Sequence, residues 1–287
     1  MSQVRSFNRL VTERVGALND HYLSRRRPLG EARVLWEIGV DGCDVRRLRS
    51  RLGLDAGYLS RLLRALERDG LILVVPSEHD RRVRTARLTA AGRRERELLD
   101  RRSDELAASM LRPLSASRRE RLVAAMAEVE HLLAASLVEI HEVDASDADA
   151  QLCLREYFAE LDRRFDAGFD HVLTPAELAA MRPPAGLFVV ATLHGEAVGC
   201  GGLRFHGDEP TELKRMWVAE SARGLGLGRR LLEELEARAA AHGTRVLRLE
   251  TNRNLAEAIA LYRSADYREV APFNDLPYAH HWFEKRL

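Results

Sequence analysis

Residues 212–236, ELKRMWVAESARGLGLGRRLLEELE, decide the fold of the second half of the chain. An apolar run at 213–218 is typical of a strand, and a polar turn and three alternate glycines separate it from an amphipathic helix. Glycine lets a backbone come close to a ligand, and the unpaired N–H groups of a helix start point toward that ligand. The stretch therefore predicts an anion site suited to a pyrophosphate.

Two common phosphate loops do not fit these glycines. A Walker loop ends in Gly-Lys-Ser/Thr, whereas Gly228 is followed by Arg229 and Arg230. A dinucleotide fingerprint that starts at Gly224 needs glycine at 229, and one that starts at Gly226 needs a small residue at 231, which is leucine here. The pattern that remains is Arg-x-x-Gly-x-Gly, directly after a strand.

This pattern resembles the acetyl-CoA loop of the GNAT family of N-acetyltransferases. A second motif, 254–262 followed by Ala-Asp-Tyr at 265–267, is similar to the family's Asn…Ala-x-x-Leu-Tyr…Gly-Phe/Tyr element. Asp266 departs from it, because the family usually has a helix-ending glycine there. Asn254 lies one residue earlier than in the commonest spacing, so Asn252 is its rival.

The resemblance implies a site for acetyl-CoA, with no metal. The residues that it implies for this site are Met216, Trp217, Val218, Arg223, Gly224, Leu225, Gly226, Leu227, Gly228, Arg229, Asn254 and Tyr262. The backbone at Met216 and Val218 would contact the pantetheine arm. Trp217 faces either the core or the substrate groove, and the sequence leaves both open.

The chemistry of acetyl transfer points to two candidate catalytic residues, of which the resemblance implies the first. Acetyl transfer needs a neutral amine and a proton for the departing thiolate. Tyr262 matches the position of the family's proton donor, and the alternative is a tyrosine packed in the core. Glu212, at the start of the strand before the loop, is the candidate general base, and the alternative is a surface carboxylate with water as the base.

Length and charge separate two domains. The 287 residues suggest two domains, and residues 1–140 contain 27 arginines and 20 carboxylates, whereas 141–287 contain 18 cations and 24 carboxylates. A basic first half predicts contact with nucleic acid there. The N-terminus has no signal-peptide core, no apolar run spans a membrane, and Cys43, Cys153 and Cys200 are expected as buried thiols, which together favour a cytoplasmic protein.

The first half predicts a helix-turn-helix followed by a hairpin. Helices are expected at 7–24, 29–38, 44–52, 55–69, 89–111 and 117–140, with caps at Asp55, Thr89 and Ser117. In the fourth helix Leu59, Leu62, Leu63 and Leu66 form the predicted buried stripe. Strands at 71–75 and 83–88 form a wing, whose arginines can enter a minor groove.

This half resembles the MarR family of dimeric regulators, over about residues 5–140. The resemblance rests on Asp-Arg-Arg at 80–82 with Leu-Thr-Ala-Ala-Gly-Arg at 88–93. It implies a homodimer formed through the first and last helices and contact with double-stranded DNA. The predicted DNA-binding residues are Tyr58, Ser60, Arg61, Arg64, Arg81, Arg82 and Arg84.

The sequence thus predicts a multidomain protein. A mainly α winged helix-turn-helix domain, 1–140, precedes an α/β (α+β) GNAT domain, 141–287, with a mixed, mostly antiparallel sheet. A linker is expected at 141–150, helices at 150–165, 227–242 and 255–265, and strands at 187–193, 197–205, 212–218, 245–250, 267–270 and 280–284.

The predicted function is a DNA-binding regulator that is also an N-acetyltransferase. The acceptor is expected to be a primary amine of a small, cationic molecule. One alternative is a regulator whose second domain senses acetyl-CoA without turnover, and another is an enzyme whose winged helix serves only dimerisation.

Overall fold

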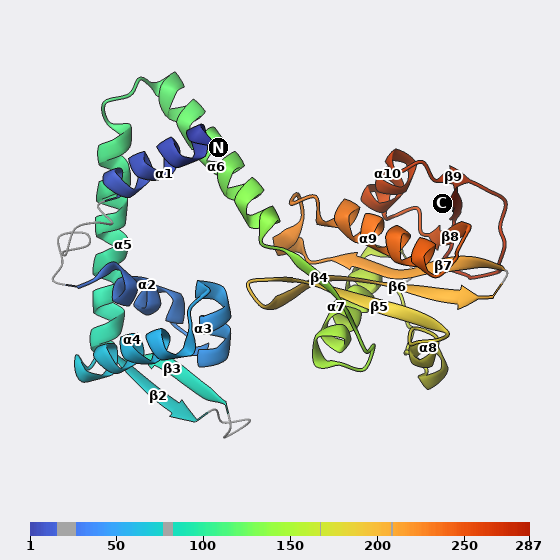
Figure 1. Cartoon of the computed structure of the whole chain (residues 1–287), viewed down its shortest axis with the longest axis horizontal. Coiled ribbons are helices and arrows are strands. Elements are labelled where there is room, and N and C mark those ends of the chain that lie inside the picture. Colours follow the sequence, from blue (N-terminus) through green and yellow to red (C-terminus); the bar gives the residue numbers. More distant parts are fainter. Residues whose placement is uncertain (16–26, 77–82, 167, 208) are drawn as a thin grey trace. The chain divides into compact units, whose positions relative to one another are not determined.

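The structure, a computed structural model, describes residues 1–15, 27–76, 83–166, 168–207 and 209–287. These residues form two units, Met1–Met126 and Ala127–Leu287 (Figure 1). The division falls within helix α6 (Ala116–Ser136). No helix of the described residues is long and apolar enough to cross a membrane.

The N-terminal unit is helical apart from a small sheet. Its helices are α1 (Ser2–Arg14), α2 (Leu29–Ile38), α3 (Val45–Leu52), α4 (Ala56–Arg68), α5 (Ala90–Leu111) and the first part of α6. Helices α2 to α5 lie where the sequence predicts them. The predicted first helix begins earlier, at Ser2, and the later part of its predicted range falls outside the described residues.

Helix α4 is positioned by its cap and its leucines. The Asp55 carboxylate accepts a hydrogen bond from the Tyr58 N–H at 2.8 Å, and Gly53 ends α3 at φ 60°. The predicted stripe is confirmed, since the buried residues of α4 are Leu59, Leu62, Leu63 and Leu66. The opposite face of α4 is therefore turned outward, as in a helix-turn-helix.

The predicted wing hairpin is present. It consists of β2 (Ile72–Pro76) and β3 (Arg84–Leu88), and a short β1 (Cys43–Asp44) pairs with β3. Thr89 caps α5 by accepting a hydrogen bond from the Gly92 N–H at 3.0 Å. A Cβ at Gly92 would lie 2.0 Å from the carbonyl oxygen of Leu71, so glycine permits α5 to start this close to the hairpin.

Two predictions at the junction are wrong. The helix predicted from a cap at Ser117 to Ile140 is α6, which begins at Ala116 and ends at Ser136. Part of the predicted linker is instead strand β4 (Glu139–Val143), which pairs antiparallel with β5 (Gly186–Leu193). An edge strand and a linker have similar polar compositions, and pairing with the rest of the sheet makes this segment a strand.

The C-terminal unit is a sheet with helices on both faces (Figure 1). Its further strands are β6 (Glu196–His206), β7 (Glu209–Val218), β8 (Val246–Thr251), β9 (Arg268–Glu269) and β10 (His281–Arg286). The order is β4-β5-β6-β7-β8-β10-β9, and among these strands the β7–β8 pair is parallel and the other pairs are antiparallel. The predicted mixed, mostly antiparallel sheet is confirmed.

Alternation along the strands builds a core on each face of the sheet. Leu187 and Val189 of β5 belong to the cluster with helix α9 (Leu227–Ala241), and Phe188 and Val190 belong to the cluster with α7 (Ala148–Arg164). Helices α8 (Pro175–Ala179) and α10 (Ala256–Ser264) complete the two layers, with a 3-10 turn (Glu220–Ala222) before α9.

Local details agree with the sequence at several points. Asp266, which replaces the expected glycine, has φ 65°, so it adopts the left-handed geometry that this position requires. His194 and Gly195 form the two-residue turn between β5 and β6, with φ of 53° and 76°. All three cysteines are buried thiols outside any disulfide, as predicted.

Candidate active site

The parallel strands β7 and β8 separate soon after they begin. They pair only at Thr211 with Leu247 and at Glu212 with Arg248. Beyond this point β8 continues its pairing with β10, whereas β7 runs on to Val218 beside β6. The separation opens the sheet, and two cavities lie there, of about 450 and 480 Å³.

The first cavity, called the donor cavity below, has a volume of about 450 Å³ and is lined by the glycine loop and the end of β7. The predicted residues in its lining are Met216, Trp217, Val218, Arg223, Gly224, Gly226, Leu227, Gly228, Arg229 and Tyr262. Two predicted residues do not line it. Leu225 packs against the core instead, and Asn254 donates hydrogen bonds to the Arg164 carbonyl at 2.8 Å and to Asp166 at 3.2 Å.

The glycine loop presents a helix start to the donor cavity. Gly224 and Gly226 have φ of 82° and 70°, and Gly226 is the N-cap of α9 without a side-chain cap. The first N–H groups of α9 therefore remain available to an anion. A Cβ at Gly228 would lie 3.4 Å from Leu261, so this glycine also allows α9 to pack closely against α10.

Cations and apolar surface suit this cavity to acetyl-CoA. Arg223 and Arg229 flank the helix start, and Arg229 is held by the Ser264 hydroxyl at 2.6 Å. Met216 and Val218 give the end of β7 an apolar edge. A pyrophosphate at the glycines and an apolar arm along β7 would match this lining.

Glu160 of α7 is the central acid of the donor cavity. One of its oxygens accepts from Trp217 Nε1 at 2.8 Å and from Arg223 at 2.6 Å, and the other accepts from Arg164 at 3.2 Å. The orientation of Trp217, which the sequence left open, is therefore toward α7. Arg164 also contacts Glu257 at 2.7 Å.

Tyr262 lies inside the unit, with its hydroxyl near the end of β7. The side chain is buried, and its hydroxyl lies 4.0 Å from Met216 Sδ. Burial raises the pKa of Tyr262, and the negative charge of Glu250 acts in the same direction. The hydroxyl is therefore protonated at neutral pH and can donate a proton.

The second cavity, called the acceptor cavity below, has a volume of about 480 Å³. It shares Tyr157, Leu161 and Leu255 with the donor cavity, so the two meet at these residues. Burial raises the pKa of Tyr157, and the Arg215 guanidinium lowers it by a smaller amount. Tyr157 is thus a protonated hydroxyl at the point where the cavities meet.

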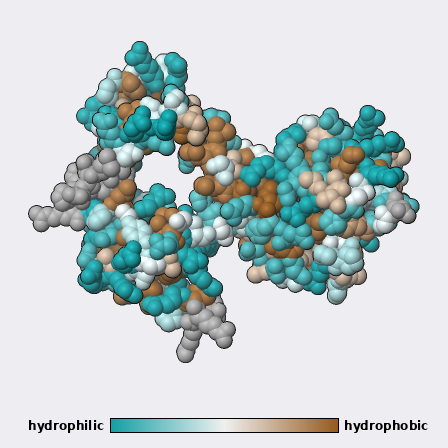
Figure 2. Space-filling model, viewed as in Figure 1, coloured by the Kyte–Doolittle hydropathy of each residue, from teal (hydrophilic) through white to brown (hydrophobic). Residues whose placement is uncertain are grey.

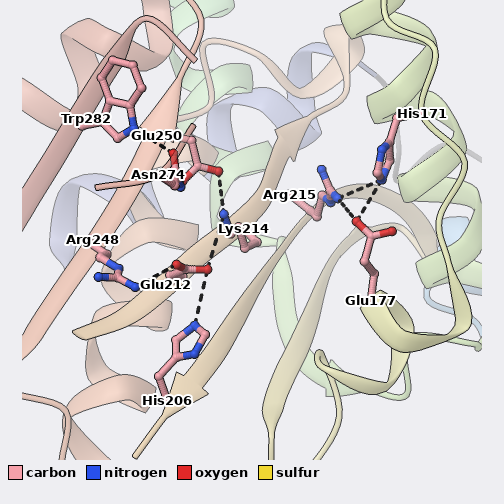
Figure 3. A network of polar contacts seen from close by, with 10 residues as sticks. All are labelled: His171, Glu177, His206, Glu212, Lys214, Arg215, Arg248, Glu250, Asn274 and Trp282. Atoms are coloured by element: carbon pink, nitrogen blue, oxygen red, sulfur yellow. Dashed lines mark hydrogen bonds and ion pairs between the residues drawn. The ribbon is translucent and has the colours of Figure 1, made fainter. Parts of the chain in front are cut away.

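A bulge in β7 places consecutive charged residues in the acceptor cavity. The register shifts between Cys200 and Gly202, and Arg215 has φ 58°. In a regular strand Lys214 and Arg215 would point to opposite faces, but here both line the cavity. Figure 3 shows Arg215 beside Glu177 and His171, at 2.8 and 3.3 Å.

The predicted base, Glu212, also lines this cavity but is surrounded by cations (Figure 3). Its oxygens lie 3.1 Å from Arg248, 3.4 Å from His206 and 3.5 Å from Lys214. Burial raises the pKa of Glu212, but Lys214, His206 and Arg248 together lower it further, so the net shift is downward. A carboxylate with a lowered pKa is a weaker base.

Glu250 is a second carboxylate of the acceptor cavity, on β8. It pairs with Lys214 at 2.5 Å, and its other oxygen lies 3.5 Å from Asn274, which accepts from Trp282 at 2.9 Å (Figure 3). Its charge also acts on the hydroxyls of Tyr157 and Tyr262. Glu250 therefore acts on both tyrosines from the acceptor cavity.

Sequence reasoning missed Tyr157, Glu160, Arg215 and Glu250. Tyr157 and Glu160 stand three residues apart on α7, a spacing that marks one face of a helix, yet nothing in it indicates a site. Asn252, the rival of Asn254, lines the acceptor cavity and holds the Tyr278 carbonyl at 2.8 Å. Among the described residues no group of three or more histidine, cysteine or acidic side chains could hold a metal ion.

The predicted DNA-binding residues fall into two sets. Tyr58, Ser60, Arg61 and Arg64 lie on α4, with Arg61 and Arg64 exposed and the Arg61 guanidinium 5.5 Å from the Tyr58 ring centre. Arg84, also exposed, lies on β3 and donates to the Val74 carbonyl at 3.2 Å. Arg81 and Arg82 lie outside the described residues.

Comparison with known proteins agrees with both halves. The model of the acetyltransferase (GNAT) family matches residues 148–267, and that of the MarR family matches residues 25–83. A protein named IAA acetyltransferase from Azospirillum brasilense is 37% identical over 134 residues, which cover 45% of this chain and 86% of that protein. An uncharacterized N-acetyltransferase from Schizosaccharomyces pombe is 31% identical over 133 residues, 45% of this chain and 80% of its own.

Among solved structures, a GNAT family acetyltransferase from Elizabethkingia anophelis with acetyl-CoA bound is similar at 17% identity. The match covers 53% of this chain and 99% of that one, with a TM-score of 0.39.

Proposed function

The chain belongs to the GNAT family of N-acetyltransferases and carries a MarR-family region, and we propose that it combines an enzyme with a DNA-binding regulator. Residues 141–287 would acetylate a primary amine of a small molecule, with acetyl-CoA as donor. Residues 1–140 would bind double-stranded DNA and dimerise.

The observation that carries the enzymatic proposal is the meeting of two unlike cavities at the split between β7 and β8. One has a helix start with free N–H groups, and the other has charged and aromatic walls. Because both contain Tyr157, Leu161 and Leu255, a donor in one and an amine in the other would meet there.

The residues of the donor cavity have separate tasks in this proposal. Acetyl-CoA supplies an electrophilic thioester carbon and a thiolate that leaves. The N–H groups after Gly226 and the guanidinium of Arg223 bind phosphate, and Met216 and Val218 orient the apolar arm. Tyr262, which is buried and protonated, gives its hydroxyl proton to the sulfur.

The proton that leaves the amine must be taken up by a base in the acceptor cavity. Glu212 is the base that the sequence predicts, but its three cations favour its charged form and weaken it as a base. Glu250 acts electrostatically on both tyrosines near the meeting point, so we assign it the amine's proton. Glu212 then serves to hold Lys214 and Arg248.

The test combines binding and turnover. Titration calorimetry measures acetyl-CoA affinity, and thiol release measures transfer to a panel of primary amines. IAA is assayed beside this panel, because the Azospirillum relative is named for it. Micromolar binding with amine-dependent thiol release supports the enzyme, binding without release supports a sensor, and absent binding contradicts both.

The regulatory proposal rests on charge and on exposed apolar residues. The outer face of α4 carries arginines, as a recognition helix does. No described residue of α1 or α6 is buried, although both helices carry large exposed apolar side chains: Val4, Phe7, Leu10, Val11, Val123, Met126, Leu132 and Leu133. Figure 2 shows such apolar residues on the visible surface along α6. A second copy of the chain would cover them.

Light scattering and DNA titration test this second part. A dimeric mass together with salt-dependent, sequence-selective binding to the promoter of its own gene supports it. A dimer without such binding would leave the winged helix with dimerisation alone.

A further inference from the structure

The acceptor cavity is lined by equal numbers of cations and carboxylates, but one of the cations has no carboxylate partner in the described parts of the chain. Among the described residues of this lining, three cations and three carboxylates occur together with His171: Arg204, Lys214, Arg215, Glu177, Glu212 and Glu250. Each carboxylate already has a cationic partner. Glu177 pairs with Arg215 at 2.8 Å, Glu250 with Lys214 at 2.5 Å, and Glu212 with Arg248, which lies beside this lining, at 3.1 Å.

Arg204 is the cation left over. It stands on β6 opposite Glu212 of β7, its side chain is exposed, and it lines the cavity. Within the part of the chain that the structure describes, its guanidinium makes no hydrogen bond or ion pair. A planar guanidinium with free donors suits a carboxylate, which it can bind through two parallel hydrogen bonds.

Another part of the same lining is aromatic. The Phe169 ring lies 4.6 Å from the Tyr278 ring and 5.4 Å from the Phe165 ring, both edge-to-face. All three rings line the cavity beside Leu276. This wall fits a flat apolar group.

From these walls we infer that the acetyl acceptor carries a carboxylate in addition to its primary amine, with an aromatic group between or beside them. The inference rests on the proposed function, because the amine must be the group that is acetylated. Arg204 binds the carboxylate, Phe169 and Tyr278 contact the aromatic group, and the amine lies toward Tyr157. This replaces the cationic acceptor expected from the sequence.

The transfer balances without a further reactant. The amine nitrogen forms a bond to the acetyl carbon of acetyl-CoA while the carbon–sulfur bond breaks. The amine proton goes to Glu250, and the sulfur takes the proton of Tyr262. Proton exchange with water restores both side chains, and the products are an N-acetylated amino carboxylate and free coenzyme A.

The experiment compares acceptors that differ only in the carboxylate. The pairs are L-phenylalanine with phenethylamine, and 4-(aminomethyl)benzoate with benzylamine, which place the amine and the carboxylate at two spacings. In one pair or both, we expect kcat/KM from thiol release to be at least about tenfold higher for the compound that carries the carboxylate. A hydrogen bond to a charged group contributes a difference of this size. Equal values in both pairs would overturn the inference while leaving the acetyltransferase intact.

Variants locate the carboxylate. Arg204→Met keeps an unbranched apolar stem and removes the guanidinium, and the ratio of the two kcat/KM values within the favoured pair should fall about tenfold or more. Arg155→Met, at an exposed position of α7 outside both cavities, is the control and should keep this ratio. A ratio that stays the same in Arg204→Met contradicts the inference, and a folding defect would lower both values together.

Binding measurements distinguish a failure of the proposed enzymatic function from a failure of the proposed carboxylate site. Calorimetry of the full chain with 4-(aminomethyl)benzoate and with L-phenylalanine needs no turnover. Binding that Arg204→Met weakens, without thiol release, would sink the proposed enzyme but keep the carboxylate site. Neither binding nor release with these compounds, while other amines react, would reject the carboxylate site alone.

Discussion

The guanidinium of Arg223 lies 2.6 Å from a carboxylate oxygen of Glu160, which joins the glycine loop to α7 across the donor cavity. Arg164, on the next turn of α7, contacts the same carboxylate at 3.2 Å. Two cations that could bind phosphate are therefore partly neutralised by one acid.

Glu160→Gln should tighten acetyl-CoA binding. The amide keeps a partner for Trp217 Nε1 and removes the charge that competes with phosphate for Arg223. Because Arg223 is partly exposed, the gain should be modest, about two- to fivefold in Kd at low salt and smaller at high salt. Calorimetry at two salt concentrations measures it, with the exposed Glu156→Gln as control. Weaker binding in Glu160→Gln would mean that the acid orients Arg223 for the phosphate.

Gly226→Glu should abolish acetyl-CoA binding, whereas Gly243→Glu should not. Both glycines have positive φ, 70° and 82°, and a Cβ on either meets no atom within 4 Å, so each substitution costs about 1–2 kcal/mol of backbone strain. Only Gly226 precedes the N–H groups that face the donor cavity. Thermal unfolding should shift alike in both variants, and calorimetry should separate them. Equal acetyl-CoA affinities would exclude this loop as the phosphate site.

Tyr262→Phe should lower kcat by about 100-fold and leave acetyl-CoA affinity within about twofold. The hydroxyl has one contact among the described residues, Met216 Sδ at 4.0 Å, so its loss disturbs little structure. Burial raises the pKa of this tyrosine, so its proton is retained through neutral and mildly alkaline pH. If kcat of the wild type falls as the pH rises toward 9, Tyr262 is therefore not the group that loses a proton. The same fall should then occur in Tyr262→Phe. A kcat equal to that of the wild type would make Tyr262 a packing residue.

Glu250→Gln should reduce kcat more than Glu212→Gln. We expect about 100-fold for Glu250 and less than about tenfold for Glu212, because Glu212 is held by Lys214, His206 and Arg248. The loss in Glu250→Gln should shrink as pH rises toward the pKa of the amine, since more of the amine is then already neutral and has one proton fewer to lose. A pH profile of kcat for both variants decides between them, and the reverse order would return the role of base to Glu212.

Arg64→Gln should weaken DNA binding. If Arg64 contacts a phosphate, the affinity falls for all DNA sequences, and if it contacts a base, the preference at one base pair is lost. A phosphate contact predicts uniform weakening and a salt slope that falls by about 1, and a base contact predicts about 1–3 kcal/mol at one position. Fluorescence anisotropy with promoter fragments measures both, and Arg155→Gln on α7 is the control. Affinity unchanged on all DNA would remove α4 from the interface.

Much of the architecture can be read from local sequence, because it depends on periodicity and on caps. The leucines of α4, the cap at Thr89 and the glycines before α9 each specify their element through contacts with near neighbours. The strand β4 could not be read this way, since its polar residues become a strand only by pairing with β5.

By itself the sequence determined that a glycine loop precedes α9 and that Tyr262 follows it on α10, because short motifs depend on neighbours along the chain. Tertiary structure alone decided which charges share a cavity. The bulge at Arg215 reverses the alternation of β7, and the separation of β7 from β8 opens the cavity that Glu250 and Tyr157 both line. Register and strand separation arise from contacts between distant segments, which no local pattern encodes.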